Sequence, residues 1–93
     1  MIVTIAHKGL RKFWQTGDAS RLPAIYVTKI RLIMGILDSV QTPERINIPF
    51  GKPHALTGNL KGYLAISISA NWRIIFRVEQ DGNVYDVDII DYH

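Results

Sequence analysis

Residues 64–90, LAISISANWRIIFRVEQDGNVYDVDII, set the architecture of this chain because apolar and polar residues alternate along them. A period of two is typical of strands that bury one face, so the segment predicts three successive strands. The residues Asp81-Gly82-Asn83 are typical of a tight hairpin turn between the last two strands. The positions expected to share a buried face are Leu64, Ile66 and Ile68, then Trp72, Ile74, Phe76 and Val78, then Tyr85, Val87 and Ile89.

The N-terminal part of the chain has a helical pattern instead. Ile2, Val3 and Ile5 predict a short first strand, and a helix is expected from His7 to Thr16 with Gly17 as its stop. A second helix is expected to begin near Pro23, since proline is favoured at the first helical position. The apolar residues at helical spacing are Leu10, Phe13 and Trp14 in the first helix, and Tyr26, Ile30, Ile33, Met34, Leu37 and Val40 in the second.

The order β-α-α-β-β-β predicts one α+β domain over residues 1–93, with two N-terminal helices packed on one face of a mostly antiparallel sheet. The other face is expected to be partly open. If Trp72, Ile74 and Phe76 point to the helices, then Arg73 and Arg77 point to the open face. Gly35 is costly within the second helix unless it allows a neighbouring element to approach closely.

The segment from Gln41 to Gly62 breaks the periodic pattern. It contains four turn-forming residues, and only Pro43-Glu44-Arg45 suggests a short helical turn. A loop of this length in a small domain is usually functional or covers an edge of the core. The turn-forming residues are Pro49, Gly51, Pro53 and Gly58.

Charge is distributed unevenly along the chain. Residues 1–78 hold all 11 Lys and Arg but three acidic residues, a net charge of +8, whereas residues 79–93 hold five acidic and no basic residues, −5. Such a positive field suits phosphates, although a solvated mixed surface would have the same composition.

Composition also excludes several classes of protein. The chain has no cysteine, so disulfide frameworks, thiolate zinc sites and thiol nucleophiles are ruled out, and a reducing cytoplasm is the expected compartment. The N-terminus resembles a strand rather than a signal peptide, and no stretch approaches the roughly 18 apolar residues of a membrane span.

Two histidines and an arginine are candidates for chemistry on a phosphodiester. His54 lies in a basic loop, His93 ends the chain, and Arg73 lies in the strand between them. Imidazole transfers protons near neutral pH without special tuning, and guanidinium binds phosphate oxygens with a planar fork of donors. Because the nucleophile in RNA cleavage can be the substrate's own 2′-OH, no serine or cysteine is required.

Five short segments, spread over nearly the whole chain, resemble a known family. They are His7-Lys8-Gly9-Leu10, Lys52-Pro53-His54-Ala55-Leu56-Thr57-Gly58, Gly62-Tyr63, Ala70-Asn71-Trp72-Arg73-Ile74 and Asp91-Tyr92-His93. Together with the length, they resemble the HigB toxins of the RelE/ParE superfamily of bacterial toxin–antitoxin systems. The resemblance implies a microbial-ribonuclease-like fold, cleavage of mRNA in the ribosomal A site, and inhibition by a HigA-type helix-turn-helix antitoxin.

The resemblance also implies which residues act. The family's catalytic positions fall on His54, Arg73, Asp91, Tyr92 and His93 of this sequence. Pro53 departs from some relatives, and Gln41 to Gly51 match only loosely, so no partner contacts are carried over there. The two histidines would be the proton-transfer pair in either order, with Arg73 as the phosphate clamp. Asp91 would orient a histidine or act directly, and Tyr92 would stack on a base or hydrogen-bond to the substrate.

Four other cations are interpreted as RNA- or ribosome-binding rather than catalytic. They are Lys8, Lys52, Lys61 and Arg77. His7 fits a helix start, and three scattered histidines have no spacing typical of a metal site, so neither a metal nor another cofactor is expected.

Two other functions remain open from sequence alone. A ParE-type toxin acting on DNA gyrase would use the same fold without a proton-transfer pair, and a plain RNA- or protein-binding module would use only the basic surface. Deleting His93 in a growth-arrest assay separates an enzyme from a binder. DNA is expected as a partner only indirectly, through the antitoxin complex, and no membrane is expected.

Overall fold

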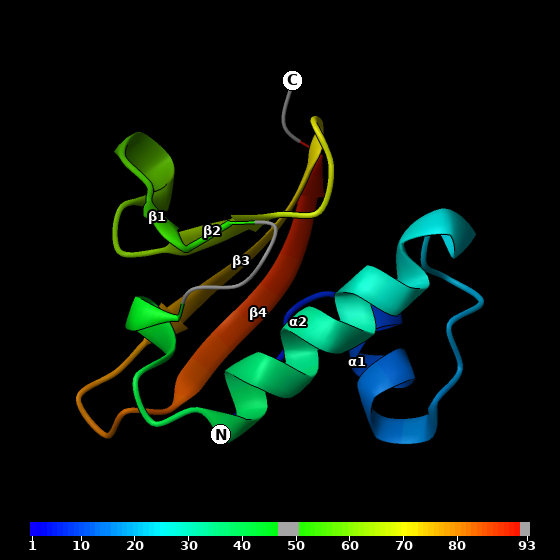
Figure 1. The fold of residues 1–93 in the computed structure, drawn as a ribbon, viewed down its shortest axis with the longest axis horizontal. Helices are drawn as coiled ribbons and strands as arrows, with labels where there is room; N and C mark the ends of the chain where they lie inside the picture. Colours follow the sequence, from blue (N-terminus) through cyan, green and yellow to red (C-terminus); the bar gives the residue numbers. More distant parts are fainter. Residues whose placement is uncertain (47–50, 92–93) are drawn as a thin grey trace.

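The computed structural model describes residues 1–46 and 51–91 (Figure 1). Tyr92 and His93, two of the expected catalytic residues, lie outside the described residues, as does Pro49 of the long loop. In the described part of the chain, two α-helices precede a four-stranded antiparallel sheet, which confirms the predicted α+β class. The short strand at His54–Ala55 lies in the segment expected to be a loop and was not predicted.

Helix α1 covers Lys8–Thr16 and is defined at both ends by its caps. Nδ1 of His7 accepts a hydrogen bond from the backbone N–H of Leu10 at 3.0 Å, which satisfies one of the donors that a helix start leaves unpaired. Gly17 ends the helix with a φ of 83°, and its N–H donates to the carbonyl of Phe13 at 2.8 Å. A left-handed residue at this position favours glycine, so the predicted stop is confirmed.

Helix α2 covers Val27–Ser39 and follows a 3-10 turn, η1, at Ala24–Tyr26, for which Pro23 is the N-cap. A Cβ at Gly35 would contact nothing within 4 Å, so no close approach within the described chain requires this glycine. The expected stripe faces the core: four members are fully buried, and Tyr26 and Val40 pack against it from its margin. The fully buried members are Ile30, Ile33, Met34 and Leu37.

The sheet has the order β1-β2-β3-β4, and every neighbouring pair is antiparallel. The long segment before β2 contributes the 3-10 turns η2, at Pro43–Arg45, and η3, at Gly58–Leu60, so the expected helical turn at Pro43-Glu44-Arg45 is confirmed. The strands are β1 at His54–Ala55, β2 at Leu64–Ser67, β3 at Trp72–Val78 and β4 at Val84–Asp91.

The N-terminal residues run parallel to β4 without forming a continuous strand. Isolated bridges join Ile2 to Val84 and Ile5 to Val87. Between them, the side-chain hydroxyl of Thr4 accepts a hydrogen bond from the backbone N–H of Asp86 at 2.8 Å. The predicted first strand is therefore reduced to two bridges, because β4 is irregular at the residue opposite Thr4.

That irregularity is a β-bulge. The pairing of β3 with β4 shifts between Ile75 and Arg77, and Asp86 has a φ of 55°. A bulge inserts one extra residue and so reverses the alternation on one side of it. Tyr85 pairs with Arg77 on the open face, whereas Val87 is fully buried in the core. The expectation that Tyr85 shares a face with Val87 and Ile89 is wrong for this reason.

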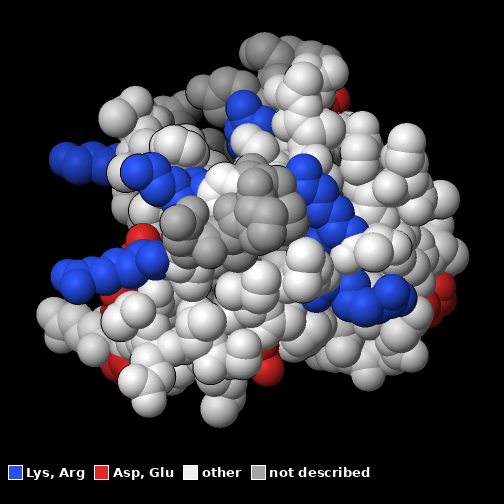
Figure 2. Space-filling model, viewed as in Figure 1, with Lys and Arg blue, Asp and Glu red and all other residues white. Residues whose placement is uncertain are grey.

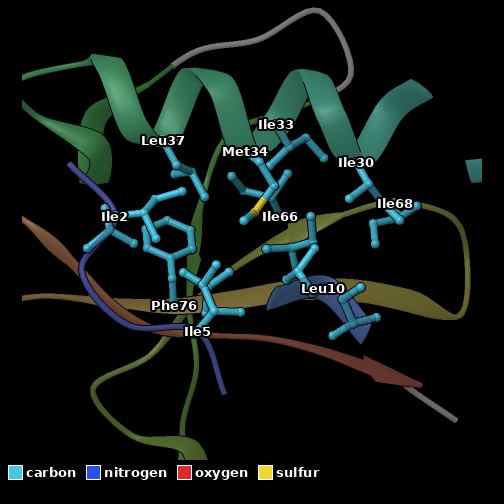
Figure 3. Packing of buried hydrophobic residues seen from close by; sticks show 14 of the residues in the cluster. Ile2, Ile5, Leu10, Ile30, Ile33, Met34, Leu37, Ile66, Ile68 and Phe76 are labelled. Atoms are coloured by element: carbon cyan, nitrogen blue, oxygen red, sulfur yellow. The ribbon is translucent and has the colours of Figure 1, made fainter. Parts of the chain in front are cut away.

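Both helices cover the same face of the sheet, and the core lies between the helices and the sheet (Figure 3). Leu37, Met34, Ile33 and Ile30 point down from α2, and Ile66 and Phe76 point up from the strands. Leu10 and Phe13 of α1 and Ile2 and Ile5 of the N-terminal segment complete the cluster. The open face carries the candidate site.

Candidate active site

The register of the strands places His54 and Arg73 on one face of the sheet. Residues that pair directly across antiparallel strands point to the same side. His54 pairs with Ala65, Ala65 with Ile75, and Ile75 with Asp88, so these four residues form one row across the sheet. The row lies on the face opposite to the helices, because the alternate residues of β2 and β3 belong to the core.

Arg73 lies in the next row of the same face, where it pairs with Ser67 and Ile90. One strand, β2, separates it from His54 across the sheet. Its Nη1 donates a hydrogen bond of 2.9 Å to the carbonyl oxygen of Ser69, in the turn between β2 and β3. The guanidinium is thus directed by the backbone of its own hairpin.

Two buried apolar residues lie beside His54 and Arg73 on this face, Ala65 as the partner of His54 and Ile75 two residues after Arg73 on β3. Ala65 and Ile75 are each only 3% exposed, although neither belongs to the core cluster on the helix side. Charged groups beside such buried apolar residues interact more strongly than they would in bulk water. His54 and Arg73 thus place an imidazole and a guanidinium, two groups that can bind an anion, on the same face of the sheet.

Asp91 does not share this face. It is the last residue of β4 and pairs with Trp72, whose side chain packs against the core on the helix side of the sheet. Its carboxylate is exposed, and its backbone is one residue beyond Ile90, the partner of Arg73. The structure therefore brings His54 and Arg73 to one face and Asp91 to the adjoining end of the sheet.

Asp88 is a residue of this face that sequence reasoning did not select. It lies in the same row as His54, and its Oδ1 accepts a hydrogen bond from the N–H of Ile89 at 2.8 Å. The alternation of Val87, Asp88 and Ile89 in the sequence already indicated this face for Asp88, since the bulge changes the phase of β4 only before Val87. Asp88 adds a carboxylate to the face that carries His54 and Arg73.

The cations expected to bind RNA lie in different places. Lys52 and Lys61 are both exposed, one before β1 and the other in the turn before β2, and so border the strand that carries His54. Figure 2 shows Lys and Arg side chains projecting from this side of the molecule, at the left of the view. Lys8 is exposed in the first turn of α1, on the helix side of the sheet, so the structure does not group it with His54.

Arg77 lies on the face of Arg73 but is engaged with carboxylates. Its Nε and Nη2 donate to Oδ2 of Asp86 at 2.9 and 2.6 Å, and its Nη1 lies 2.7 Å from Oε1 of Glu79. The hydrogen bonds to Asp86 are the main reason that the pKa of Arg77 is raised above its usual value. Two carboxylates thus offset the charge that was expected to contact RNA.

A hollow of about 340 Å³ lies away from this face, lined mainly by Ile2, Val3, Thr4 and Ile5 of the N-terminal segment and by Arg11 and Trp14 of α1. It contains none of the expected catalytic residues.

Among residues 1–46 and 51–91, no three His, Cys, Asp or Glu side chains are grouped so that they could hold a metal ion. Neither described helix has the length and apolar character to cross a bilayer.

The topology and the solved structures that resemble it define a RelE-type toxin fold. The YoeB–YefM complex from Staphylococcus aureus contains a chain that superposes with a TM-score of 0.61 at 21% identity, covering 100% of this chain and 98% of that one. The YoeB/ParE toxin from Agrobacterium tumefaciens superposes with a TM-score of 0.61 at 26% identity, covering 100% and 99%.

Sequence comparison narrows the class to one family. The profile of the family described as RelE-like toxin of type II toxin-antitoxin system HigB matches residues 3–93. Endoribonuclease HigB of Proteus vulgaris is 34% identical over 93 residues, with 100% of both chains covered. The chain belongs to the HigB-like toxins of type II toxin–antitoxin systems.

Proposed function

We propose that this toxin is a ribosome-dependent endoribonuclease that cleaves mRNA in the A site and so inhibits translation. The observation that carries the proposal is the placement of His54 and Arg73 on one sheet face beside the buried Ala65 and Ile75. The relative that is named an endoribonuclease matches this chain along its whole length, which supports the same chemistry here.

In the proposed reaction, the ribose 2′-OH attacks the adjacent phosphorus and the 5′-oxygen of the next nucleotide leaves. A base removes the proton of the 2′-OH and an acid protonates the leaving oxygen, and His54 and His93 serve these roles without a metal ion. Arg73 stabilises the charge on the phosphoryl oxygens, since guanidinium forms two parallel hydrogen bonds to phosphate. Asp91 orients a histidine, and Tyr92 contacts the substrate base.

The proposed partners follow from the same chemistry. Lys52 and Lys61, exposed around β1, bind the phosphate backbones of mRNA and ribosomal RNA. A HigA-type helix-turn-helix antitoxin neutralises the toxin in the cytoplasm and brings it to DNA only as part of the complex. The solved complex of a YoeB chain with YefM supports a protein partner of this kind.

The proposal is tested by incubating the toxin with purified ribosomes that carry an mRNA and analysing the RNA fragments. Attack by the 2′-OH leaves a 2′,3′-cyclic or 3′-phosphate and a 5′-hydroxyl, and cleavage persists in EDTA when Mg²⁺-dependent ribosome integrity is controlled. Replacing His54 by Ala, or deleting His93, is expected to slow cleavage by roughly 10²–10⁴-fold. A 5′-phosphate on the downstream fragment would exclude the mechanism, and normal cleavage by the folded His93 deletion would remove that residue from it.

A further inference from the structure

The turn that joins β2 to β3 is fixed by its own backbone and one side chain. The N–H groups of Ile68 and Ser69 donate to the carbonyl oxygen of Trp72 at 2.8 and 3.2 Å. Oγ of Ser69 accepts a hydrogen bond from the N–H of Trp72 at 3.2 Å. The bond from the N–H of Ser69 fixes the peptide plane that it shares with the carbonyl group of Ile68. The side-chain bond between Ser69 and Trp72 closes the turn that carries the next carbonyl group, that of Ser69.

Those two consecutive carbonyl oxygens each accept a hydrogen bond from a cation, and the two cations come from opposite sides of the sheet. Nζ of Lys29, in α2, donates to the carbonyl oxygen of Ile68 at 2.7 Å in a partly buried position. Nη1 of Arg73, on the open face, donates to the carbonyl oxygen of Ser69 at 2.9 Å. Charged donors make shorter and stronger hydrogen bonds than neutral ones, so both bonds restrain the turn.

We propose that Lys29 is a positioning residue for Arg73, an inference that rests on the proposed ribonuclease function. The side chain of Ile68 is 3% exposed and lies in the core beneath α2, so Lys29 ties the turn to a helix that four buried residues hold in place. The same turn presents the carbonyl oxygen of Ser69 to the guanidinium. Lys29 thus acts through the backbone on a residue of the opposite face.

Removing this donor is expected to let the turn move relative to α2 and to displace the guanidinium of Arg73. A displacement of about 1 Å at a reacting group can cost on the order of 100-fold in rate. Lys29→Met should therefore lower the single-turnover rate of mRNA cleavage at saturating ribosomes by about 10–100-fold with little change in ribosome affinity. Lys29→Arg, which keeps a charged donor, should retain most of the rate.

The matched control is Lys12→Met. Lys12 lies in α1, its Nζ pairs with Asp18 at 3.1 Å on the surface, and its replacement removes the same charge without touching the turn. A double-mutant cycle gives the sharper result. In an Arg73→Ala background, Lys29→Met should cause no further reduction of the rate, because there is no guanidinium left to position. The proposal would be overturned if the rate reductions of Lys29→Met and Arg73→Ala multiply in the double variant. It would also be overturned if Lys29→Met and Lys12→Met lower the cleavage rate equally.

A second measurement does not depend on catalysis. In ¹⁵N NMR spectra of the free protein, the side-chain Nε–H of Arg73 should be ordered in the wild type and Lys29→Arg, and more mobile in Lys29→Met. If the wild type fails to cleave, the proposed function is refuted while this measurement still decides the role of Lys29. An unchanged Arg73 signal in folded Lys29→Met overturns the positioning role. Lys29→Ala, which also lacks a donor, replaces the Met variant if the latter does not fold.

Discussion

Arg77 donates hydrogen bonds from two nitrogens to a single carboxylate oxygen of Asp86, at 2.9 Å from Nε and 2.6 Å from Nη2. The carbon of the same guanidinium lies 6.0 Å from the centre of the Tyr63 ring, and Nη1 pairs with Glu79. Asp86 is the positive-φ residue of the bulge in β4. The guanidinium of Arg77 therefore stabilises the bulge at which the pairing of β3 and β4 shifts register.

We expect Arg77→Met to act on stability more than on RNA binding. The variant cannot pair with Asp86 or Glu79, so its melting temperature should fall, although the exposure of these ion pairs keeps the effect modest. The slope of log ribosome affinity against log salt concentration should stay close to that of the wild type, because Asp86 and Glu79 already offset the charge of Arg77. A flattened slope with an unchanged melting temperature would assign Arg77 to phosphate binding instead. Thermal denaturation measures the melting temperature, and ribosome binding at several salt concentrations measures the salt slope.

Lys52 and Lys61 should show the opposite behaviour. Each is exposed near β1, and neither forms an ion pair with a carboxylate among the residues that the structure describes. Lys52→Ala or Lys61→Ala should weaken ribosome binding and flatten the salt slope by about 0.7 for each phosphate that is no longer neutralised. The melting temperature should be unchanged. A large reduction of the single-turnover rate at saturating ribosome would show that the residue acts in the chemical step.

The bulge itself can be tested at Asp86. Its φ of 55° is tolerated by Asp and Asn but is strained for a β-branched residue. Asp86→Val is expected to cost about 1–2 kcal/mol of backbone strain in addition to the removal of the ion pair with Arg77. Asp86→Asn keeps the backbone conformation and is the control for removal of the charge. Equal unfolding free energies of the two variants, measured in urea, would contradict a strained bulge.

His7 provides a test of a histidine whose role is structural. Its Nδ1 caps α1 through the N–H of Leu10, so His7→Ala should lower the free energy of unfolding by about 1 kcal/mol. His7→Asn should restore most of this stability, since Asn is a good N-cap. The single-turnover cleavage rate of either folded variant should match the wild type, in contrast to His54→Ala. A reduced rate in folded His7→Asn would place His7 at the substrate.

The pH dependence of stability has a defined sign at Asp18. The backbone N–H of Ser20, and then the side chains of Ser20 and Lys12, lower the pKa of this carboxyl from 3.8 to about 2. A lowered folded-state pKa stabilises the native state above the unfolded value, so this contribution is complete above pH 3.8 and disappears as pH falls through about 2.

The titration can be followed by ¹³C NMR of the carboxyl group. Lys12→Met should raise the pKa of Asp18 by the smaller part of the shift, because Ser20 is the larger cause. Titration of Asp18 at its ordinary pKa in the wild-type protein would show that the hydrogen bond from Ser20 is not maintained in solution.

Most of the fold could be predicted because local patterns and tertiary contacts agree. The spacing of Leu10 and Phe13, the stop at Gly17 and the alternation of β2 and β3 all reappear as expected. Prediction failed at Tyr85, where the bulge changes the phase of β4. A bulge depends on contacts with Arg77 and Thr4, which are 9 and 82 residues from Asp86 in the chain. A periodic pattern cannot reveal such contacts.

The candidate site likewise combines features that follow from local sequence with features that depend on distant contacts. The sequence alone determined the two helices, the three long strands, the uneven charge and the side of the sheet on which Arg73 lies, because these follow from local periodicity and residue chemistry. Only the tertiary structure decided that His54 lies on the same face as Arg73, that Asp91 faces the other side, and that Lys29 reaches the turn beside Arg73. Strand register and side-chain reach across a sheet are set by packing of the whole core, which no short segment encodes.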